Sequence, residues 1–106
     1  MNTTKPLAYV INEIEVTDPA VYQTFLDRHT PIVQAAGGRY LSRGEKLVAL
    51  DGMVPRRFAI IQFDSMEQAQ AYRDSAAYKE IVPIRDKGSK FRSFIAQGSV
   101  SATVGK

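Results

Sequence analysis

Hydrophobic and polar residues alternate from Tyr9 to Val16 in the segment YVINEIEV, and this period of two predicts a β-strand. One face of the predicted strand is mostly apolar and carries Val10, Asn12, Ile14 and Val16. The opposite face is mixed and carries Tyr9, Ile11, Glu13 and Glu15. We therefore expect the two sides of the sheet to meet different surroundings.

The spacing of apolar residues changes to three and four after Asp18-Pro19, which predicts a helix with Asp18 as its N-cap. Its apolar stripe consists of Val21, Tyr22, Phe25, Leu26, Ile32, Val33 and Ala36. Pro31 removes a backbone donor, so we expect a kink or break near Thr30. Gly37-Gly38 should end the helix.

The rest of the chain is predicted to contain three more strands and a second helical region. Residues 39–42 and 57–63 are predicted strands, and Gly44 allows a bend before residues 46–50 continue in an extended conformation. Ser65 and Gln68 fit a capping box at the start of a second helix. Residues 76–87 should be helical in pieces, because Pro83 can only open a new turn. Residues 91–97 form the last predicted strand.

The order β-α-β-β-α-β predicts an α+β, ferredoxin-like domain with an antiparallel sheet and helices on one sheet face. We expect residues 1–106 to be one domain with an ordered core over about 7–98, and residues 99–106 to be a tail or a dimer arm. The uncovered sheet face would carry Tyr9, Ile11, Phe58, Ile60 and Ile95. Such an apolar face predicts a homodimer formed through it.

Composition narrows the chemistry that the chain can support. Its 106 residues include no cysteine, which excludes a disulfide scaffold, a cysteine-based zinc site, an iron–sulfur cluster and a thiol nucleophile. With a single histidine, we expect no metal site and no cofactor. The sequence contains no apolar run of about 18 residues and no signal-peptide pattern, so we expect a soluble cytoplasmic protein with no membrane partner.

The net charge of +3 raises the question of nucleic-acid binding, because the RNA-recognition fold has the same topology. Residues 56–63, RRFAIIQF, partly match the third-strand signature of that fold. However, Arg57 replaces its glycine, Ile60 replaces a base-stacking aromatic residue, and Glu13 and Glu15 place negative charge on the platform. We therefore consider RNA binding the less favoured alternative.

Several spaced motifs resemble one known family. They are YVINEIEVTDPAVY from Tyr9, AAGGRYLSRG from Ala35, FDS from Phe63, AYRDSAAY from Ala71 and PIRD from Pro83. Together they resemble the domain-of-unknown-function family numbered 1330, in the dimeric α+β barrel superfamily. The resemblance implies a ferredoxin-like protomer whose open sheet face pairs with a second copy. Superfamily relatives include cofactor-free monooxygenases, muconolactone isomerases and haem peroxidases.

Three residues are candidates for acid–base catalysis. His29 lies on the apolar stripe of the first helix and could be a general base in a pocket opened at Pro31, or a hydrogen-bonded structural histidine. Glu13 could be an acid or base inside a dimer barrel, or could pair with Arg92. Tyr72 could supply a phenolic donor, or could simply pack in the core.

Ligand recognition has its own candidates, which are Arg39, Tyr40, Tyr78 and Arg85, with Arg43 as a further cation. Arginine binds carboxylates in a bidentate manner, and tyrosine hydroxyls can line an apolar pocket. The sequence thus predicts a homodimer that binds a small, partly apolar or anionic metabolite, with cofactor-free acid–base or isomerase chemistry. The alternative is a non-catalytic structural or regulatory dimer.

Overall fold

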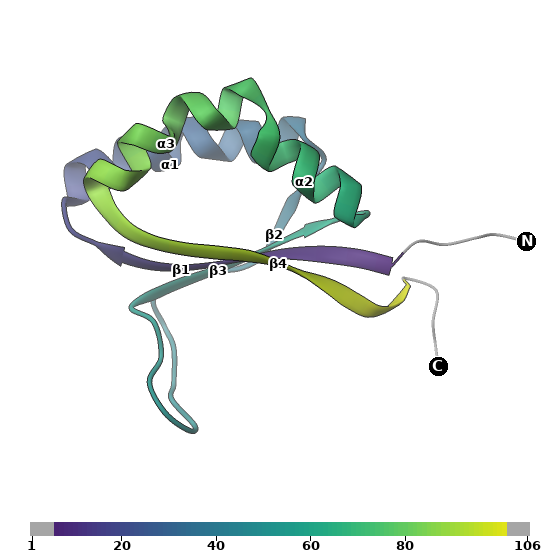
Figure 1. Cartoon of the computed structure of the whole chain (residues 1–106). Coiled ribbons are helices and arrows are strands. Elements are labelled where there is room, and N and C mark those ends of the chain that lie inside the picture. The colour runs from purple at the N-terminus through teal and green to yellow at the C-terminus, as the bar shows by residue number, and fades with distance from the viewer. Residues whose placement is uncertain (1–5, 102–106) are drawn as a thin grey trace, which may run out of the picture.

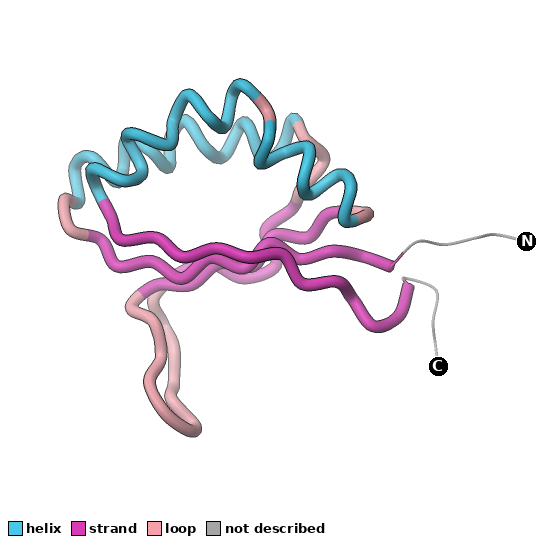
Figure 2. The backbone as a smooth tube through the Cα atoms, in the orientation of Figure 1, coloured by secondary structure: helices cyan, strands magenta, loops and turns pink. Residues whose placement is uncertain are grey.

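A computed structural model describes residues 6–101 as a four-stranded antiparallel sheet with three helices on one of its faces (Figure 1). The elements are β1 Pro6–Val16, α1 Pro19–Ala35, β2 Arg39–Gly44, β3 Arg57–Phe63, α2 Met66–Asp74, α3 Ala76–Gly88 and β4 Ser89–Ser101. The strand order is β2-β3-β1-β4, which confirms the predicted ferredoxin-like α+β fold. Figure 2 shows the layer of helices lying above the layer of strands.

The central strand β1 has the two faces that its sequence pattern predicts. Val10 and Ile14 are buried beneath the helices, together with Asn12, while Ile11 and Glu13 face the opposite side. Because directly opposed residues of antiparallel strands share a face, the partners on β3 and β4 divide in the same way. The core therefore lies between the sheet and the helices, with Phe25, Phe63, Ile61 and Ile81 among its fully buried residues.

The open face of the sheet carries Tyr9, Ile11, Phe58 and Ile60, as predicted. The assignment of Ile95 to this face was wrong, because Ile95 pairs with Val10 and packs against the core. Phe94, which pairs with Ile11, occupies the open face instead and is 47% exposed. The apolar character of this face is therefore retained with a different residue of β4.

The predicted helix ends are confirmed. The side chain of Asp18 accepts a hydrogen bond from the backbone of Val21, and Gly37 takes a left-handed φ of 85° just after α1. Ser65 caps α2 by accepting from the backbone N–H of Gln68. The Gln68 side chain accepts from Asp64 N and donates to the carbonyl of Ala36, so it also ties α2 to the end of α1.

The two internal prolines do not interrupt their helices. The predicted break at Pro31 is absent because α1 runs unbroken from Pro19 to Ala35, and α3 is one helix through Pro83 rather than two pieces. Both prolines are exposed, as are Asp27 and Lys79 four residues earlier. A carbonyl that loses its donor on the solvent side of a helix can bind water instead, so the helix continues.

A loop of residues 45–56 connects β2 to β3 and projects on the side of the sheet away from the helices (Figure 1). No strand forms over residues 46–50, which were predicted to continue in an extended conformation, because no neighbouring strand pairs with this segment. Its apolar side chains are highly exposed: Val48 is 81%, Leu50 is 91% and Met53 is 96% exposed. We call residues 45–56 the projecting loop.

The last strand is longer than predicted. β4 extends from Ser89 to Ser101 and pairs with β1 along its length, up to Pro6 opposite Ser101. Part of the predicted tail is therefore strand, while residues 102–106 lie outside the described residues. Within residues 6–101, no helix is long and apolar enough to cross a membrane.

Candidate functional site

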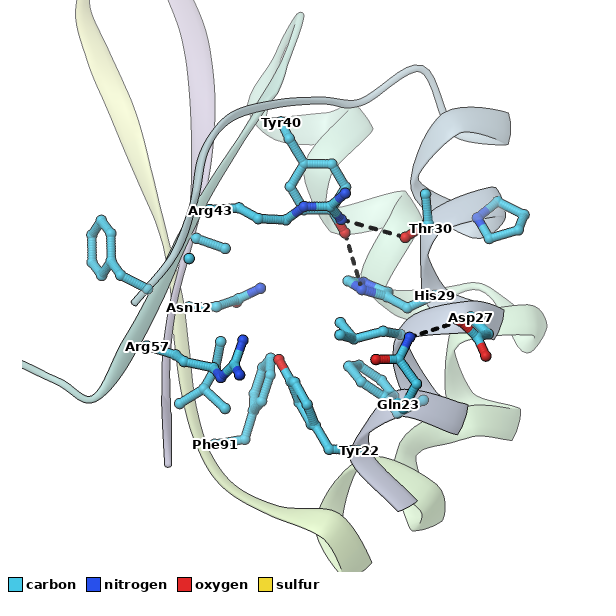
Figure 3. Close-up of a pocket in the computed structure, with 17 residues that line it drawn as sticks. Asn12, Tyr22, Gln23, Asp27, His29, Thr30, Tyr40, Arg43, Arg57 and Phe91 are labelled. Carbon is cyan, nitrogen blue, oxygen red and sulfur yellow. Dashed lines mark hydrogen bonds between the residues drawn. The ribbon is translucent and has the colours of Figure 1, made fainter. Parts of the chain in front are cut away.

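A cavity of about 540 Å³ opens between α1 and the sheet (Figure 3). Side chains from four strands and one helix surround it. Its polar lining comprises Asn12 from β1, Tyr22, Gln23, Asp27, His29 and Thr30 from α1, Tyr40 and Arg43 from β2, and Arg57 from β3. Its apolar lining includes Ile14, Phe25, Leu26, Phe58, Ala59 and Phe91. The size suits a small organic molecule.

His29 forms part of the cavity wall and is almost completely buried, with 2% of its surface exposed. Its ring stacks on Phe25 with the centroids 4.9 Å apart. Its Nε2 atom is hydrogen-bonded to the hydroxyl of Tyr72, and its Nδ1 atom lies 3.3 Å from the hydroxyl of Tyr40. Both ring nitrogens are thus occupied by tyrosines from different elements.

The surroundings keep His29 neutral at physiological pH. Burial, reinforced by the positive charges of Arg73, Arg43 and Arg85, lowers the pKa of His29 to about 4. Burial also raises the pKa of Tyr72 well above its ordinary value. The wall therefore contains an uncharged imidazole and a protonated phenol.

The hydrogen-bond directions follow from the partners available. The Tyr72 hydroxyl needs an acceptor in the core, and Nε2 of His29 is its hydrogen-bond partner among the described residues. A neutral imidazole then carries its proton on Nδ1, which donates to the Tyr40 oxygen. The Tyr40 O–H is then directed away from His29, and Thr30 and Arg43 also hydrogen-bond to the Tyr40 side chain. Burial raises the pKa of Tyr40, so its hydroxyl stays protonated at physiological pH.

On the wall of the cavity opposite α1, three neighbouring strands each contribute one side chain that can donate hydrogen bonds. Arg43 pairs with Ala59 on β3, and Ala59 pairs with Asn12 on β1, so these three residues form one row across the sheet. Arg57 lies two residues before Ala59. The small Ala59 side chain leaves room above the sheet between the donors. Figure 3 shows Arg43, Asn12 and Arg57 directed toward the same space.

Negative charge is scarce in this lining. Asp27 is its one carboxylate, and Asp27 lies on the outer side of α1, where Gln23 donates to it at 2.9 Å. Glu45 of the projecting loop approaches Arg57 only to 3.8 Å and is itself 69% exposed. The cavity therefore presents cations and neutral donors, without an internal anion to balance them.

Two of the predicted catalytic residues meet, and the third lies elsewhere. His29 and Tyr72 are hydrogen-bonded to each other, as described above. Glu13 faces the open side of the sheet, away from the cavity, because it alternates with Asn12 and Ile14 along β1. Its carboxylate lies 3.1 Å from Arg92, which confirms the predicted ion pair.

The predicted ligand-binding residues also lie in different parts of the molecule. Tyr40 lines the cavity, whereas Arg39 pairs with Gln62 and lies on the open face. Tyr78 and Arg85 lie behind His29: the Tyr78 ring meets the His29 ring edge-on at 5.7 Å, and Arg85 donates to the Tyr78 hydroxyl at 2.8 Å. Arg85 is also paired with Asp86 at 2.9 Å. These two residues border a second, shallower groove between α2, α3 and β4.

The sequence analysis missed Asn12, Tyr22 and Arg57 as site residues. Asn12 carried a signal, because it is the one polar residue on an otherwise apolar strand face. Arg57 carried no such signal, since only the strand register shows that its side chain rises beside Asn12 on the helix side. Tyr22 looked like an ordinary member of the helix stripe, but its hydroxyl reaches the cavity (Figure 3).

Comparison with known proteins identifies the chain's relatives. The model of a domain of unknown function, DUF1330, matches residues 7–99. The chain belongs to the DUF1330 family. No curated protein matches this DUF1330 chain.

Solved structures similar to the DUF1330 chain share its fold. A protein of unknown function from Rhodopseudomonas palustris has 14% identity and a TM-score of 0.73, with 93% of this chain and 87% of that chain covered. SnoaB, a cofactor-independent oxygenase from Streptomyces nogalater, has 9% identity and a TM-score of 0.66, with 93% and 99% covered. A dimeric ferredoxin-like protein of unknown function from Bacteroides fragilis has 10% identity and a TM-score of 0.59, with 90% and 99% covered.

Proposed function

We propose that this DUF1330 protein binds a small carboxylate with an apolar body in the cavity between α1 and the sheet. The observation that carries the proposal is the polar lining, in which Arg43, Arg57 and Asn12 converge over Ala59 while Asp27 turns away. Guanidinium groups without an internal counter-ion favour an anionic ligand, and arginine forms bidentate hydrogen bonds with carboxylates.

The apolar lining supports the second half of the proposal. Phe25, Leu26 and Phe91 lie on the helix side and the β4 side of the cavity, near the arginine-lined space. An aromatic or branched hydrocarbon body would bury apolar surface there, worth roughly 25 cal/mol per Å². The ligand would therefore place its carboxylate over Ala59 and its body against these rings.

We expect 3-phenylpropanoate to raise the melting temperature of the protein, whereas the uncharged 3-phenylpropan-1-ol should not. Ligand that binds the native state stabilises it, by about 2.7 kcal/mol at a hundredfold excess over Kd. Replacing both arginines, Arg43→Gln with Arg57→Gln, should weaken binding of the acid at least a hundredfold, since hydrogen bonds to charged groups contribute about 1.5–3 kcal/mol each. Differential scanning fluorimetry and titration calorimetry measure these effects.

Arg39→Gln is the matched control, because it removes the same charge from the open face of the sheet. This variant should bind 3-phenylpropanoate like the unmodified protein. Equal stabilisation by the alcohol, or an equal loss of affinity in Arg39→Gln, would contradict a carboxylate site in the cavity.

We also propose that two copies associate through their open sheet faces. This face carries Ile11, Phe58, Ile60 and Phe94, and the exposed apolar residues of the projecting loop lie on the same side of the molecule. Contiguous apolar surface of this kind marks protein–protein interfaces. The dimeric relative from Bacteroides fragilis supports a homodimer.

A second candidate function is cofactor-free tautomerisation of the bound ligand, and the placement of Tyr40 favours it. The Tyr40 oxygen accepts from Nδ1 of His29, and the Arg43 guanidinium lies 4.1 Å from the centre of its ring. Both groups would stabilise a Tyr40 phenolate. SnoaB, with the same fold, is a cofactor-independent oxygenase.

The step would be ketonisation of an enolate bound over Ala59. The Tyr40 O–H bond breaks, a C–H bond forms at the enolate carbon, and the negative charge passes from the ligand to the Tyr40 oxygen. Water at the cavity mouth then returns a proton to the phenolate, and the hydroxide that forms takes the O–H proton of the next enol to give its enolate and water. In this step His29 is a positioning residue, because Nδ1–H holds the Tyr40 oxygen.

The protein should accelerate the ketonisation of the enol form of phenylpyruvate, followed by the loss of its ultraviolet absorbance. We expect Tyr40→Phe to lower the rate at least tenfold, because the proton donor is gone, with little change in ligand affinity. Tyr9→Phe is the control, since it removes a hydroxyl from the open face. A Tyr40→Phe variant with an undiminished rate would eliminate Tyr40 as the donor.

A further inference from the structure

A chain of three hydrogen-bonded side chains runs from α2, along the helix side of β4 and β1, to the cavity. Nη1 of Arg73 donates to Oγ of Ser93 at 2.7 Å, and Oγ of Ser93 lies 2.6 Å from Oδ1 of Asn12. Ser93 and Asn12 are directly opposed on β4 and β1, so the strand register holds them together. Asn12 is buried, with 3% of its surface exposed.

The direction of this chain begins at Arg73. A guanidinium group can only donate, so Ser93 accepts from Arg73 and keeps its own proton to donate. The Ser93 hydroxyl donates that proton to Oδ1 of Asn12, so Asn12 presents its oxygen to Ser93. The amide nitrogen of Asn12 is then directed the other way, into the cavity (Figure 3).

This orientation makes Asn12 a donor of fixed direction beside the arginines. Among the described residues, the side-chain hydrogen bonds of Asn12 are made by its oxygen, which leaves both amide hydrogens for a ligand. Donors that are held in place before binding favour negative charge or a carbonyl oxygen at that point. An amide that could rotate would present either its oxygen or its nitrogen to the ligand, and would not distinguish a ligand acceptor from a ligand donor.

We infer that Asn12 is a specificity-determining residue, and that the ligand carries a carbonyl or enol oxygen next to its carboxylate. Ser93 and Arg73 are positioning residues, because they reach the ligand only through Asn12. The inference rests on the proposed carboxylate site and deepens it: the substrate class becomes 2-oxo acids with an apolar body. Arg43 and Arg57 would bind the carboxylate, while Nδ2 of Asn12 binds the neighbouring oxygen.

The test compares two acids of the same carbon skeleton, phenylpyruvate and 3-phenylpropanoate, which differ in the 2-oxo group. Titration calorimetry should show that the unmodified protein binds phenylpyruvate about tenfold more tightly, the effect of one additional hydrogen bond. In Asn12→Asp, an acceptor replaces the donor, so phenylpyruvate should lose at least this tenfold advantage. In Ser93→Ala, the amide is free to rotate, and the ratio of the two affinities should fall toward one.

Ser93→Thr keeps the hydroxyl group and should therefore keep the preference for phenylpyruvate over 3-phenylpropanoate. A preference that is lost in Ser93→Ala and kept in Ser93→Thr depends on the hydroxyl group, and a loss of folding or packing would not explain it. Affinity for 3-phenylpropanoate should be unchanged in both Ser93 variants. Equal affinities for the two acids in the unmodified protein would overturn the role of Asn12 and leave the carboxylate site standing. Failure of both acids to bind would overturn the carboxylate site as well.

Discussion

Replacing Ile60 by aspartate should convert the proposed homodimer into a monomer. Ile60 lies on β3 opposite Ile11, at the centre of the open sheet face. In a symmetric dimer each substitution occurs twice, and two carboxylates would be buried in an apolar interface at a cost of several kcal/mol each. We expect Kd for dimerisation to rise more than a thousandfold.

Size-exclusion chromatography with light scattering measures the outcome, since the monomer mass is 11.8 kDa. Ala77→Asp, on the exposed side of α3, adds the same charge to the helix layer and should leave the dimer intact. Leu50→Ser with Met53→Ser changes only the projecting loop, so it leaves the core untouched and should also weaken the dimer. An unmodified protein that stays at 11.8 kDa at micromolar concentration would refute the homodimer.

Protonation of His29 in acid should lower the free energy of unfolding by about 3 kcal/mol, in addition to the loss caused by the carboxylates of the protein. The pKa of His29 is about 4 in the folded chain, against an ordinary value of 6.5. One pKa unit corresponds to about 1.36 kcal/mol. Between pH 6.5 and 4 the unfolded chain therefore binds a proton that the folded chain does not, and stability falls as pH falls through this window.

The groups packed around His29 explain why the folded site resists the proton. Burial contributes most, and Arg73 from α2, Arg43 from β2 and Arg85 from α3 add positive charge on three sides. Tyr72 and Tyr40 remain uncharged in this pH range, because burial raises the pKa of both side chains. A protonated imidazole would also lose the hydrogen bond that Nε2 accepts from Tyr72.

Urea unfolding at pH 7 and pH 3 measures this effect in the unmodified protein and in His29→Gln. The variant has no imidazole to protonate, so its stability should decrease by about 3 kcal/mol less than that of the unmodified protein over this interval. The comparison cancels the contribution of the carboxylates, which are the same in both proteins. Identical pH profiles would mean that His29 has the same pKa in the folded and the unfolded chain.

Local sequence signals predicted the fold well where a single residue determines the backbone conformation at the end of a helix. Asp18 and Ser65 cap the predicted helices, and Gly37 adopts the left-handed conformation that ends α1. Pro83 was misleading because the sequence does not show whether a helix presents a proline to water or to the core. Ile95 was misplaced because the face of an edge strand depends on its register with β1.

The candidate site was harder to predict because it depends on pairing between distant strands. His29 and Tyr72 were identified individually, but their contact joins residues 43 positions apart. Arg57 and Asn12 become neighbours only when β3 pairs with β1, and Ser93 fixes Asn12 from a distance of 81 positions. A side chain's chemistry is readable from its identity, but its partners depend on the register of the whole sheet.

The position of β1 in the sheet has a consequence for how the chain folds during synthesis. β1 lies between β3 and β4, and Ile14 pairs with Phe91, so one edge of β1 has no partner until the last strand is made. At about 5–20 residues per second, a ribosome takes on the order of ten seconds to cover this separation. During that time the incomplete sheet exposes the backbone of its central strand. Addition of β4 beside β1 completes the sheet and brings Ser93 to Asn12, so the last strand to be synthesised also completes the polar wall of the cavity.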